Sequence, residues 1–319
     1  MSTNRIYNHT KINKQTAQEL FNCYDNNIKV TSLSLIPEGL STSNYTVYTN
    51  QGSYLLKIYP NTDENSLKEI ASYKLASEQV RVPKVHYFSN SLKVINKHFS
   101  IMQYIEGVSL KNFVIHNNDL PLPIVCNIAN GLACLHNRTY EHRALLNSNL
   151  TIKQSLPTFH SGFLNCLQGF AGNHLSVELI HKITQFIEQN KKTIQELDLE
   201  IVFSHGDFNP ANILIDKDNN VWFIDFEYSL ASSRYVDIGK FFRERDGLVA
   251  YVSNDVYETF FNCYNKSCKK QLPLNWVKLA KVTDMLALLG FINKENPPKD
   301  WINAIEKALF NTIKFLNTK

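Results

Sequence analysis

The segment His205-Gly-Asp207-Phe-Asn-Pro-Ala-Asn212 carries the side-chain types that a phosphoryl-transfer site needs, and a second carboxylate, Asp225, follows thirteen residues after Asn212. The spacing H-x-D-x-x-x-x-N followed by D-F can place a base, two metal ligands and a substrate hydroxyl around the γ-phosphate of a nucleotide. An alcohol is a poor nucleophile at neutral pH, so a carboxylate must orient it and accept its proton. The spacing makes Asp207 the candidate base.

The same segment offers ligands for a metal ion. A nucleoside triphosphate carries several negative charges, and Mg²⁺ that bridges its oxygens prefers hard oxygen ligands. The amide of Asn212 and the carboxylate of Asp225 are ligands of this kind. We therefore predict that these two residues hold Mg²⁺.

Three short strands are expected around these residues, at 201–203, 213–215 and 221–224. The last two are apolar and are separated by the turn-forming run Lys217-Asp-Asn-Asn220, which indicates a hairpin. The hairpin would bring Asp225 beside Asn212. Either Asp207 or Asn212 alone would ordinarily cap a helix or form a turn, but the joint pattern favours a phosphotransferase.

The segment resembles the catalytic motif of the aminoglycoside phosphotransferase and choline kinase-like family, a branch of the protein kinase-like fold. The resemblance implies an α+β, two-lobed architecture. A small N-terminal lobe would contain an antiparallel sheet and one helix, and a larger C-terminal lobe would be mainly helical. It also implies ATP or GTP as co-substrate and Mg²⁺ as cofactor.

Upstream, Tyr54-Leu-Leu-Lys57-Ile-Tyr is an apolar strand with one lysine, similar to the lysine of the family that contacts the α- and β-phosphates. Such a lysine, taken alone, is more often an edge residue with its ammonium in water. A helix is expected from Asp63 to Gln79. On it, the resemblance makes Glu69 the partner of Lys57, with Glu64 and Glu78 as alternatives. The apolar positions that recur at helical spacing there are Leu67, Ile70, Ala71 and Leu75.

Two other segments resemble nucleotide-binding parts of the family. The run from Pro37 to Val47 is similar to the nucleotide-covering loop but has one glycine, so hydroxyl groups such as those of Ser41 and Ser43 would assist backbone N–H groups in binding phosphate. The strand and turn at 99–107 resemble the linker between the lobes, which implies that Met102 and Tyr104 neighbour the adenine.

Asp237 and His205 are expected to support the catalytic segment without taking part in the chemistry. In relatives, an aspartate at the position of Asp237 accepts hydrogen bonds from the catalytic loop. Gly206 replaces the arginine of H-R-D, and Glu227 replaces the glycine of D-F-G. The missing arginine would read a phosphorylated activation loop, so its absence favours a small-molecule kinase over a phosphorylation-switched protein kinase.

The length of 319 residues is sufficient for two lobes that share a nucleotide cleft. We place the nucleotide-binding lobe at 1–105 and the catalytic and acceptor-binding lobe at 106–319, with a helical insertion at about 145–200. A helix is expected at 124–136. A late helix would place Leu279, Val282, Leu286 and Leu289 on one buried stripe.

Composition excludes several classes of protein. The formal net charge of +4 without a long basic cluster argues against nucleic acid as a partner. The first residues lack a signal-peptide pattern, and no apolar run is long enough to span a membrane, so a cytoplasmic protein without membrane contact is expected. The six cysteines include no C-x-x-C pair, and most are expected to be reduced core thiols.

Two classes of acceptor remain as alternatives. One is an aminoglycoside-type antibiotic, and the other is a metabolite of the choline, thiamine, sugar or homoserine type. From Phe241 onward basic residues outnumber acidic ones, which argues against a polycationic aminoglycoside. Glu244, Asp246, Asp255 and Glu258 could still converge on an amine. A silent nucleotide-binding protein is the other hypothesis, and the presence of Lys57, Asp207, Asn212 and Asp225 argues against it.

Overall fold

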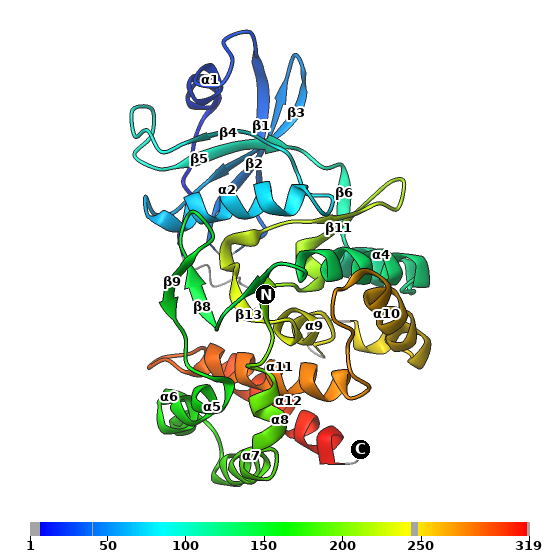
Figure 1. Cartoon of the computed structure of the whole chain (residues 1–319). Helices are drawn as coiled ribbons and strands as arrows, with labels where there is room; N and C mark the ends of the chain where they lie inside the picture. The colour runs from blue at the N-terminus through cyan, green and yellow to red at the C-terminus, as the bar shows by residue number, and fades with distance from the viewer. Residues whose placement is uncertain (1–6, 40, 244–247, 318–319) are drawn as a thin grey trace. The chain divides into compact units, whose positions relative to one another are not determined.

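The computed structural model describes residues 7–39, 41–243 and 248–317 (Figure 1). By its internal contacts the chain divides into two compact units. Unit 1 comprises residues 1–107, 147–150 and 222–227, and unit 2 comprises residues 108–146, 151–221 and 228–319. The sequence-based boundary at 105/106 assigned the two short segments of unit 1 to the C-terminal lobe.

Unit 1 is built on a five-stranded antiparallel sheet with the order β1-β2-β3-β5-β4. The strands are β1 (Val30–Ile36), β2 (Ser43–Thr49), β3 (Gly52–Ile58), β4 (Val85–Ser89) and β5 (Phe99–Gln103). Helix α1 (Lys14–Asn22) buries Ala17, Leu20 and Phe21 in one apolar cluster with strand residues such as Val47 and Leu56. This core holds the strand that carries Lys57.

Helix α2 (Glu64–Ser77) confirms the expected helix, and Asp63 caps it by accepting a hydrogen bond from the Asn65 N–H. The four apolar positions at helical spacing, Leu67, Ile70, Ala71 and Leu75, are only partly buried. The buried positions are Ser66, Lys68, Glu69, Ser72, Tyr73 and Ala76. The helix therefore turns a largely polar face inward, and this face carries Glu69 and Tyr73.

Unit 2 is mainly helical. Its helices are α3 (Leu110–Asn117), α4 (Leu122–Leu135), α5 (Phe159–Gln168), α6 (Phe170–His174), α7 (Val177–Gln189), α8 (Lys191–Glu196), α9 (Tyr235–Phe241), α10 (Asn254–Ser267), α11 (Trp276–Ile292) and α12 (Lys299–Asn317). The expected insertion at about 145–200 is helical from α5 to α8, but strands β8 (Ala144–Leu146) and β9 (Ile152–Ser155) precede these helices. The predicted late helix is α11, which buries Leu279, Val282 and Leu289 and leaves Leu286 partly exposed.

A five-stranded antiparallel sheet in unit 2 has the order β7-β10-β13-β8-β9. Its strands are β7 (Thr139–Tyr140), β8 (Ala144–Leu146), β9 (Ile152–Ser155), β10 (Ile201–Ser204) and β13 (Leu230–Ser233). Strands β6 (Gly107–Ser109), β11 (Ile213–Asp216) and β12 (Val221–Phe223) form a three-stranded sheet with the order β12-β11-β6. The strands expected around the motif are thus confirmed as β10, β11 and β12.

Helix α9 packs closely against α11 because Gly239 has no side chain. A Cβ atom at Gly239 would lie 2.4 Å from the carbonyl oxygen of Ala280. The hydroxyl of Thr283 donates a hydrogen bond to the carbonyl oxygen of Tyr235 at 2.6 Å. The buried side chains of Arg243 and Asp284 pair just beyond α9, with Arg243 Nε 2.8 Å from Asp284 Oδ1. These contacts fix α9, which carries Asp237.

Four of the six cysteines are free thiols, as expected for most of them, but the other two are paired. Cys126 of α4 and Cys263 of α10 form a disulfide, so they are not free thiols. Among the remaining cysteines, Cys166 is buried, Cys134 and Cys268 are partly buried, and Cys23 is exposed. The two bonded residues are 137 positions apart, and no sequence pattern marks them as partners.

Candidate active site

Lys57 lies on β3 in unit 1 and is almost completely buried. Its Nζ is 2.6 Å from Oε1 of the fully buried Glu69, which confirms the expected pairing. A second carboxylate, Asp225, lies 2.8 Å away through Oδ1. Burial opposes the charge on Lys57, but the two carboxylates outweigh it and raise the pKa of the ammonium well above its ordinary value. Lys57 is therefore a cation with a fixed direction.

The two alternative partners of Lys57 have other positions. Glu64 accepts hydrogen bonds from the backbone N–H and the hydroxyl of Ser148, at 3.0 and 3.1 Å. Glu78 is exposed and caps the C-terminal end of α2. Glu69 alone among the three belongs to the buried face of the helix.

Asp225 has a backbone conformation that non-glycine residues rarely adopt, with φ of 68°. Its N–H donates a hydrogen bond to the hydroxyl oxygen of Tyr73 at 2.8 Å, and the ring of Phe226 packs edge-on against that of Tyr73. Helix α2 thus holds both Lys57, through Glu69, and the backbone of Asp225. Tyr73 is not among the site residues predicted from the sequence. Strain of this kind persists where surrounding contacts enforce it, commonly at functional sites.

Glu227 adds a third carboxyl group to this part of unit 1. Burial, and then the negative charge of Asp225, raise the pKa of Glu227 to about 7, while Ser41 forms a hydrogen bond with it that opposes the shift. In the sequence, Glu227 is notable only because it replaces the glycine of D-F-G. Because Glu227 interacts with both Ser41 and Asp225, the hydroxyl of Ser41 belongs to the same cluster of polar side chains as Asp225.

The other predicted nucleotide contacts differ in accessibility. Ser43 begins β2, is 2% exposed, and its Oγ accepts a hydrogen bond from the Thr10 N–H at 2.8 Å. This burial argues against a phosphate contact by Ser43. Met102 is fully buried within β5, opposite Leu55 of β3, whereas Tyr104 follows the strand and is partly exposed.

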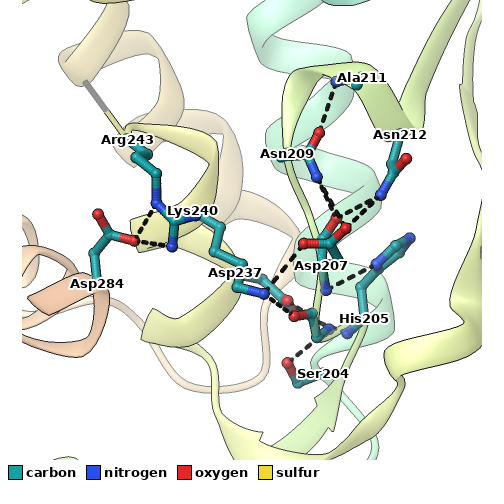
Figure 2. Close-up of polar contacts among 11 residues, drawn as sticks. Ser204, His205, Asp207, Asn209, Ala211, Asn212, Asp237, Lys240, Arg243 and Asp284 are labelled. Carbon is teal, nitrogen blue, oxygen red and sulfur yellow. Dashed lines mark hydrogen bonds and ion pairs between the residues drawn. The ribbon is translucent and has the colours of Figure 1, made fainter. Parts of the chain in front are cut away.

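In unit 2 the catalytic segment leaves β10 and ends in the 3₁₀ turn η1 (Pro210–Asn212). Figure 2 shows Asp207 beneath two amides. Its Oδ2 accepts a hydrogen bond from Nδ2 of Asn209 and another from Nδ2 of Asn212, both at 3.0 Å. Asn209 in turn accepts the Ala211 N–H through its own oxygen, at 2.9 Å. These contacts fix the carboxylate from one side.

The arrangement of Asn212 suits a metal ligand. Its Nδ2 donates to Asp207 Oδ2 and also to the carbonyl oxygen of Asp207 at 2.9 Å. Since both neighbours are acceptors, the NH₂ group must face them, and the amide oxygen faces away (Figure 2). Within the described residues no group of three or more His, Cys, Asp or Glu side chains could hold a metal ion. Mg²⁺ commonly takes one or two protein ligands and completes its shell with phosphates and water, which matches this donor set.

Asp237 of α9 supports the loop from His205 to Asn212, as expected. Its two oxygens accept the backbone N–H groups of His205 and Gly206, at 2.8 and 2.9 Å. His136 Nε2 lies 3.0 Å from Asp237 Oδ2, and His136 Nδ1 lies 2.7 Å from the hydroxyl of Tyr264. Burial opposes the charge of Asp237, but its hydrogen bond with His136, the positive potential of the two histidines and the Gly206 N–H lower its pKa. Asp237 is thus a buried anion.

His205 is fully buried and supports the loop, in agreement with the expected role. Its Nδ1 lies 3.3 Å from the backbone N of Asp207, and its ring packs edge-on against Phe208. Three supporting residues are not predicted from the sequence. His136, at the end of α4, contacts Asp237, and Tyr264 of α10 contacts His136. The third is Lys240 of α9, whose Nζ lies 3.2 Å from Asp207 Oδ1.

Gly206 is required by the course of the loop. Its φ is 79°, and a Cβ atom there would lie 2.0 Å from the carbonyl oxygen of Tyr228. We expect Gly206→Ala to lower the free energy of unfolding by about 2–4 kcal/mol, from left-handed strain plus displacement of backbone. Gly52→Ala is the matched control, because Gly52 has φ of 117° but no neighbour within 4 Å. Equal losses in urea denaturation would show that the contact with Tyr228 is unimportant.

Of the four acidic residues that could bind an amine of the acceptor, two lie on a described helix. Asp255 and Glu258 lie on α10 and are exposed. Glu244 and Asp246 lie outside the described residues. In the part of the chain that the structure describes, no helix combines the length and the apolar character needed to cross a membrane.

Similar structures share this fold across nearly the whole chain. A Ralstonia eutropha JMP134 protein, inferred to be an aminoglycoside phosphotransferase, has a TM-score of 0.69 at 12% identity, with 97% of this chain and 99% of that one covered. Macrolide 2′-phosphotransferase MphH from Brachybacterium faecium gives 0.65 at 11% identity, covering 92% and 98%. A thermostable mutant of aminoglycoside phosphotransferase APH(4)-Ia, in ternary complex with AMP-PNP and hygromycin B, gives 0.66 at 13% identity, covering 94% and 97%.

These likenesses establish the protein kinase-like fold that was predicted, with a sheet-rich unit and a mainly helical unit. No protein of curated function matches the sequence significantly. The model of the phosphotransferase enzyme family (APH) matches residues 32–256, which include Lys57, Asp207, Asn212, Asp225 and Asp237. The chain therefore belongs to the phosphotransferase enzyme family, and it is an enzyme of the small-molecule phosphotransferase class.

Proposed function

We propose that this protein transfers the γ-phosphoryl group of ATP or GTP to a hydroxyl group of a small molecule, with Asp207 as the base. The observation that carries the proposal is the Asp207 carboxylate, held by the Asn209 and Asn212 amides at the end of a strand in a chain of the phosphotransferase family. The acceptor O–H gives its proton to Asp207 as its oxygen bonds to phosphorus. The bond from phosphorus to the nucleoside diphosphate breaks, and the diphosphate keeps the electron pair.

Unit 1 supplies the nucleotide contacts in this proposal. Lys57, aimed by Glu69, would bind the α- and β-phosphates, and Ser41 would bind phosphate from the preceding loop. Met102 and Tyr104 would neighbour the base. Bound Mg²⁺ would neutralise the charge of the phosphates, and we propose that Asn212 and Asp225 hold it.

The acceptor that we favour is an aminoglycoside-type antibiotic or a related compound, which would make the protein a resistance enzyme. The names of the similar structures support this choice, because they include aminoglycoside and macrolide phosphotransferases. A structure named for fructosamine-3-kinase supports the alternative, a kinase of a metabolite of the sugar, choline, thiamine or homoserine type. A silent nucleotide-binding protein is the weakest hypothesis, because the sequence retains the candidate base Asp207 and the candidate metal ligands Asn212 and Asp225.

The test is Mg²⁺-dependent release of ADP or GDP by the purified protein across aminoglycosides, macrolides, choline, thiamine, homoserine and sugars. Asp225→Ala is the control, and we expect it to abolish release by removing a metal ligand. Asp218→Ala, at an exposed turn position, should behave like the wild type. Release stimulated by one compound names the acceptor class. Bound nucleotide without release for any compound would favour the silent binding protein.

A further inference from the structure

The cation nearest to the candidate base comes from outside the catalytic segment. The run from His205 to Asn212 contains no lysine or arginine. Lys240 of α9 instead brings its Nζ to 3.2 Å from Asp207 Oδ1, and the side chain is only 12% exposed. The same ammonium donates a hydrogen bond to the carbonyl oxygen of Gly206. A lysine with two partners in one loop has a defined direction, which a solvated surface lysine lacks.

Helix α9 contacts the loop through two side chains of opposite charge. Asp237 accepts the N–H groups of His205 and Gly206, and Lys240, three residues later, donates to Gly206 and Asp207. Residues three apart on a helix lie on the same face. Figure 2 shows both side chains reaching the loop from α9. Asp237 therefore fixes two backbone N–H groups of the loop. Lys240 fixes the carbonyl group of Gly206 and the carboxylate of Asp207.

The hydrogen bonds of Asp207 leave room for one more partner. An ionised carboxylate accepts about four hydrogen bonds. Within the described residues, Oδ2 accepts from Asn209 and Asn212, and Oδ1 accepts from Lys240. The position that is left lies on Oδ1, the oxygen that Lys240 contacts. A hydroxyl that binds there would meet a carboxylate whose plane is already set by three donors.

We propose that Lys240 is a positioning residue for phosphoryl transfer. It holds Asp207 so that the remaining lone pair of Oδ1 faces the acceptor hydroxyl. This inference rests on the proposed function, because it assigns Lys240 a role through the base. The rate of a reaction between positioned groups depends strongly on their placement. A displacement of a catalytic group by about 1 Å lowers the rate on the order of 10²-fold.

The experiment compares Lys240→Met with Lys240→Arg, using Lys266→Met, an exposed lysine of α10, as the matched charge control. We expect Lys240→Met to lower kcat by on the order of 10- to 100-fold, with the KM for nucleotide changed less than about threefold. Arginine should restore most of the rate. Lys240→Cys treated with 2-bromoethylamine, which rebuilds an ammonium of lysine length, should also restore it, with identically treated wild type as reference.

A second readout separates this inference from the proposed function. Hydrogen exchange of the backbone amides at 205–212 should be faster in Lys240→Met than in the wild type or Lys266→Met. If the wild type turns over no acceptor but this difference is present, the proposed reaction fails, and only the contact by which Lys240 holds the loop from His205 to Asn212 is supported. Unchanged exchange, normal turnover in Lys240→Met, or failure of both the arginine and the aminoethyl variants to restore turnover would overturn the role of Lys240.

Discussion

Replacing Asp207 with alanine is expected to lower turnover by on the order of 10²-fold or more, because the acceptor hydroxyl then loses the group that orients it and takes its proton. Nucleotide binding should survive. The Lys57, Glu69 and Asp225 group lies in unit 1, and its ion pairs run from Lys57 to the two carboxylates. The measurement is steady-state turnover with the acceptor found in the panel, together with the dissociation constant of the nucleotide.

Two variants sharpen the interpretation of this result. Asp207 also holds Asn212, through Oδ2 and the backbone carbonyl, so Asp207→Ala also removes a contact of the proposed metal ligand Asn212. Asp207→Asn keeps the size of the side chain and an oxygen for one of the two amides, yet it cannot act as a base. If the two variants lose turnover equally while Mg²⁺ dependence is retained, loss of the base explains the defect. Near-normal turnover in either variant would contradict the role of Asp207 as the base.

Replacing Asp237 with alanine is expected to lower the free energy of unfolding by about 3–5 kcal/mol, and to lower turnover with it. The carboxylate is fully buried and accepts the His205 and Gly206 N–H groups and contacts His136. Its removal takes the carboxylate acceptor away from the two N–H groups and from His136 in the buried interior. Chemical denaturation monitored by fluorescence measures the change, and Asp218→Ala at the exposed turn is the control.

The same aspartate links stability to pH. Since folding lowers the pKa of Asp237, the folded protein binds the proton less tightly than the unfolded chain does. Its contribution is therefore complete above the unfolded pKa of about 3.9 and is lost as pH falls through the lower folded pKa. The acid-induced loss of stability should be shallower in Asp237→Asn than in the wild type. An identical acid profile in the two proteins would contradict a buried, ionised Asp237.

The sequence by itself determined the features that depend on short stretches of chain. The strands β10, β11 and β12, the turn at 217–220 and helix α2 follow from local apolar runs, turn residues and an aspartate cap, which act within a few residues. The spacing from His205 to Asn212 likewise specifies the hydrogen bonds among Asp207, Asn209 and Asn212, because they lie in one tight turn. The family resemblance supplied the Lys57 and Glu69 pair.

Only the tertiary structure decided which distant side chains support those groups. Lys240 reaches Asp207 across 33 residues, Tyr73 reaches Asp225 across 152, and His136 reaches Asp237 across 101. It also decided that α2 buries a polar face, and that Cys126 lies against Cys263. The physical reason is that local propensity fixes which face a helix could present but not what packs against it. A charged or polar residue becomes a buried partner only when a remote segment brings the complementary group within about 3 Å.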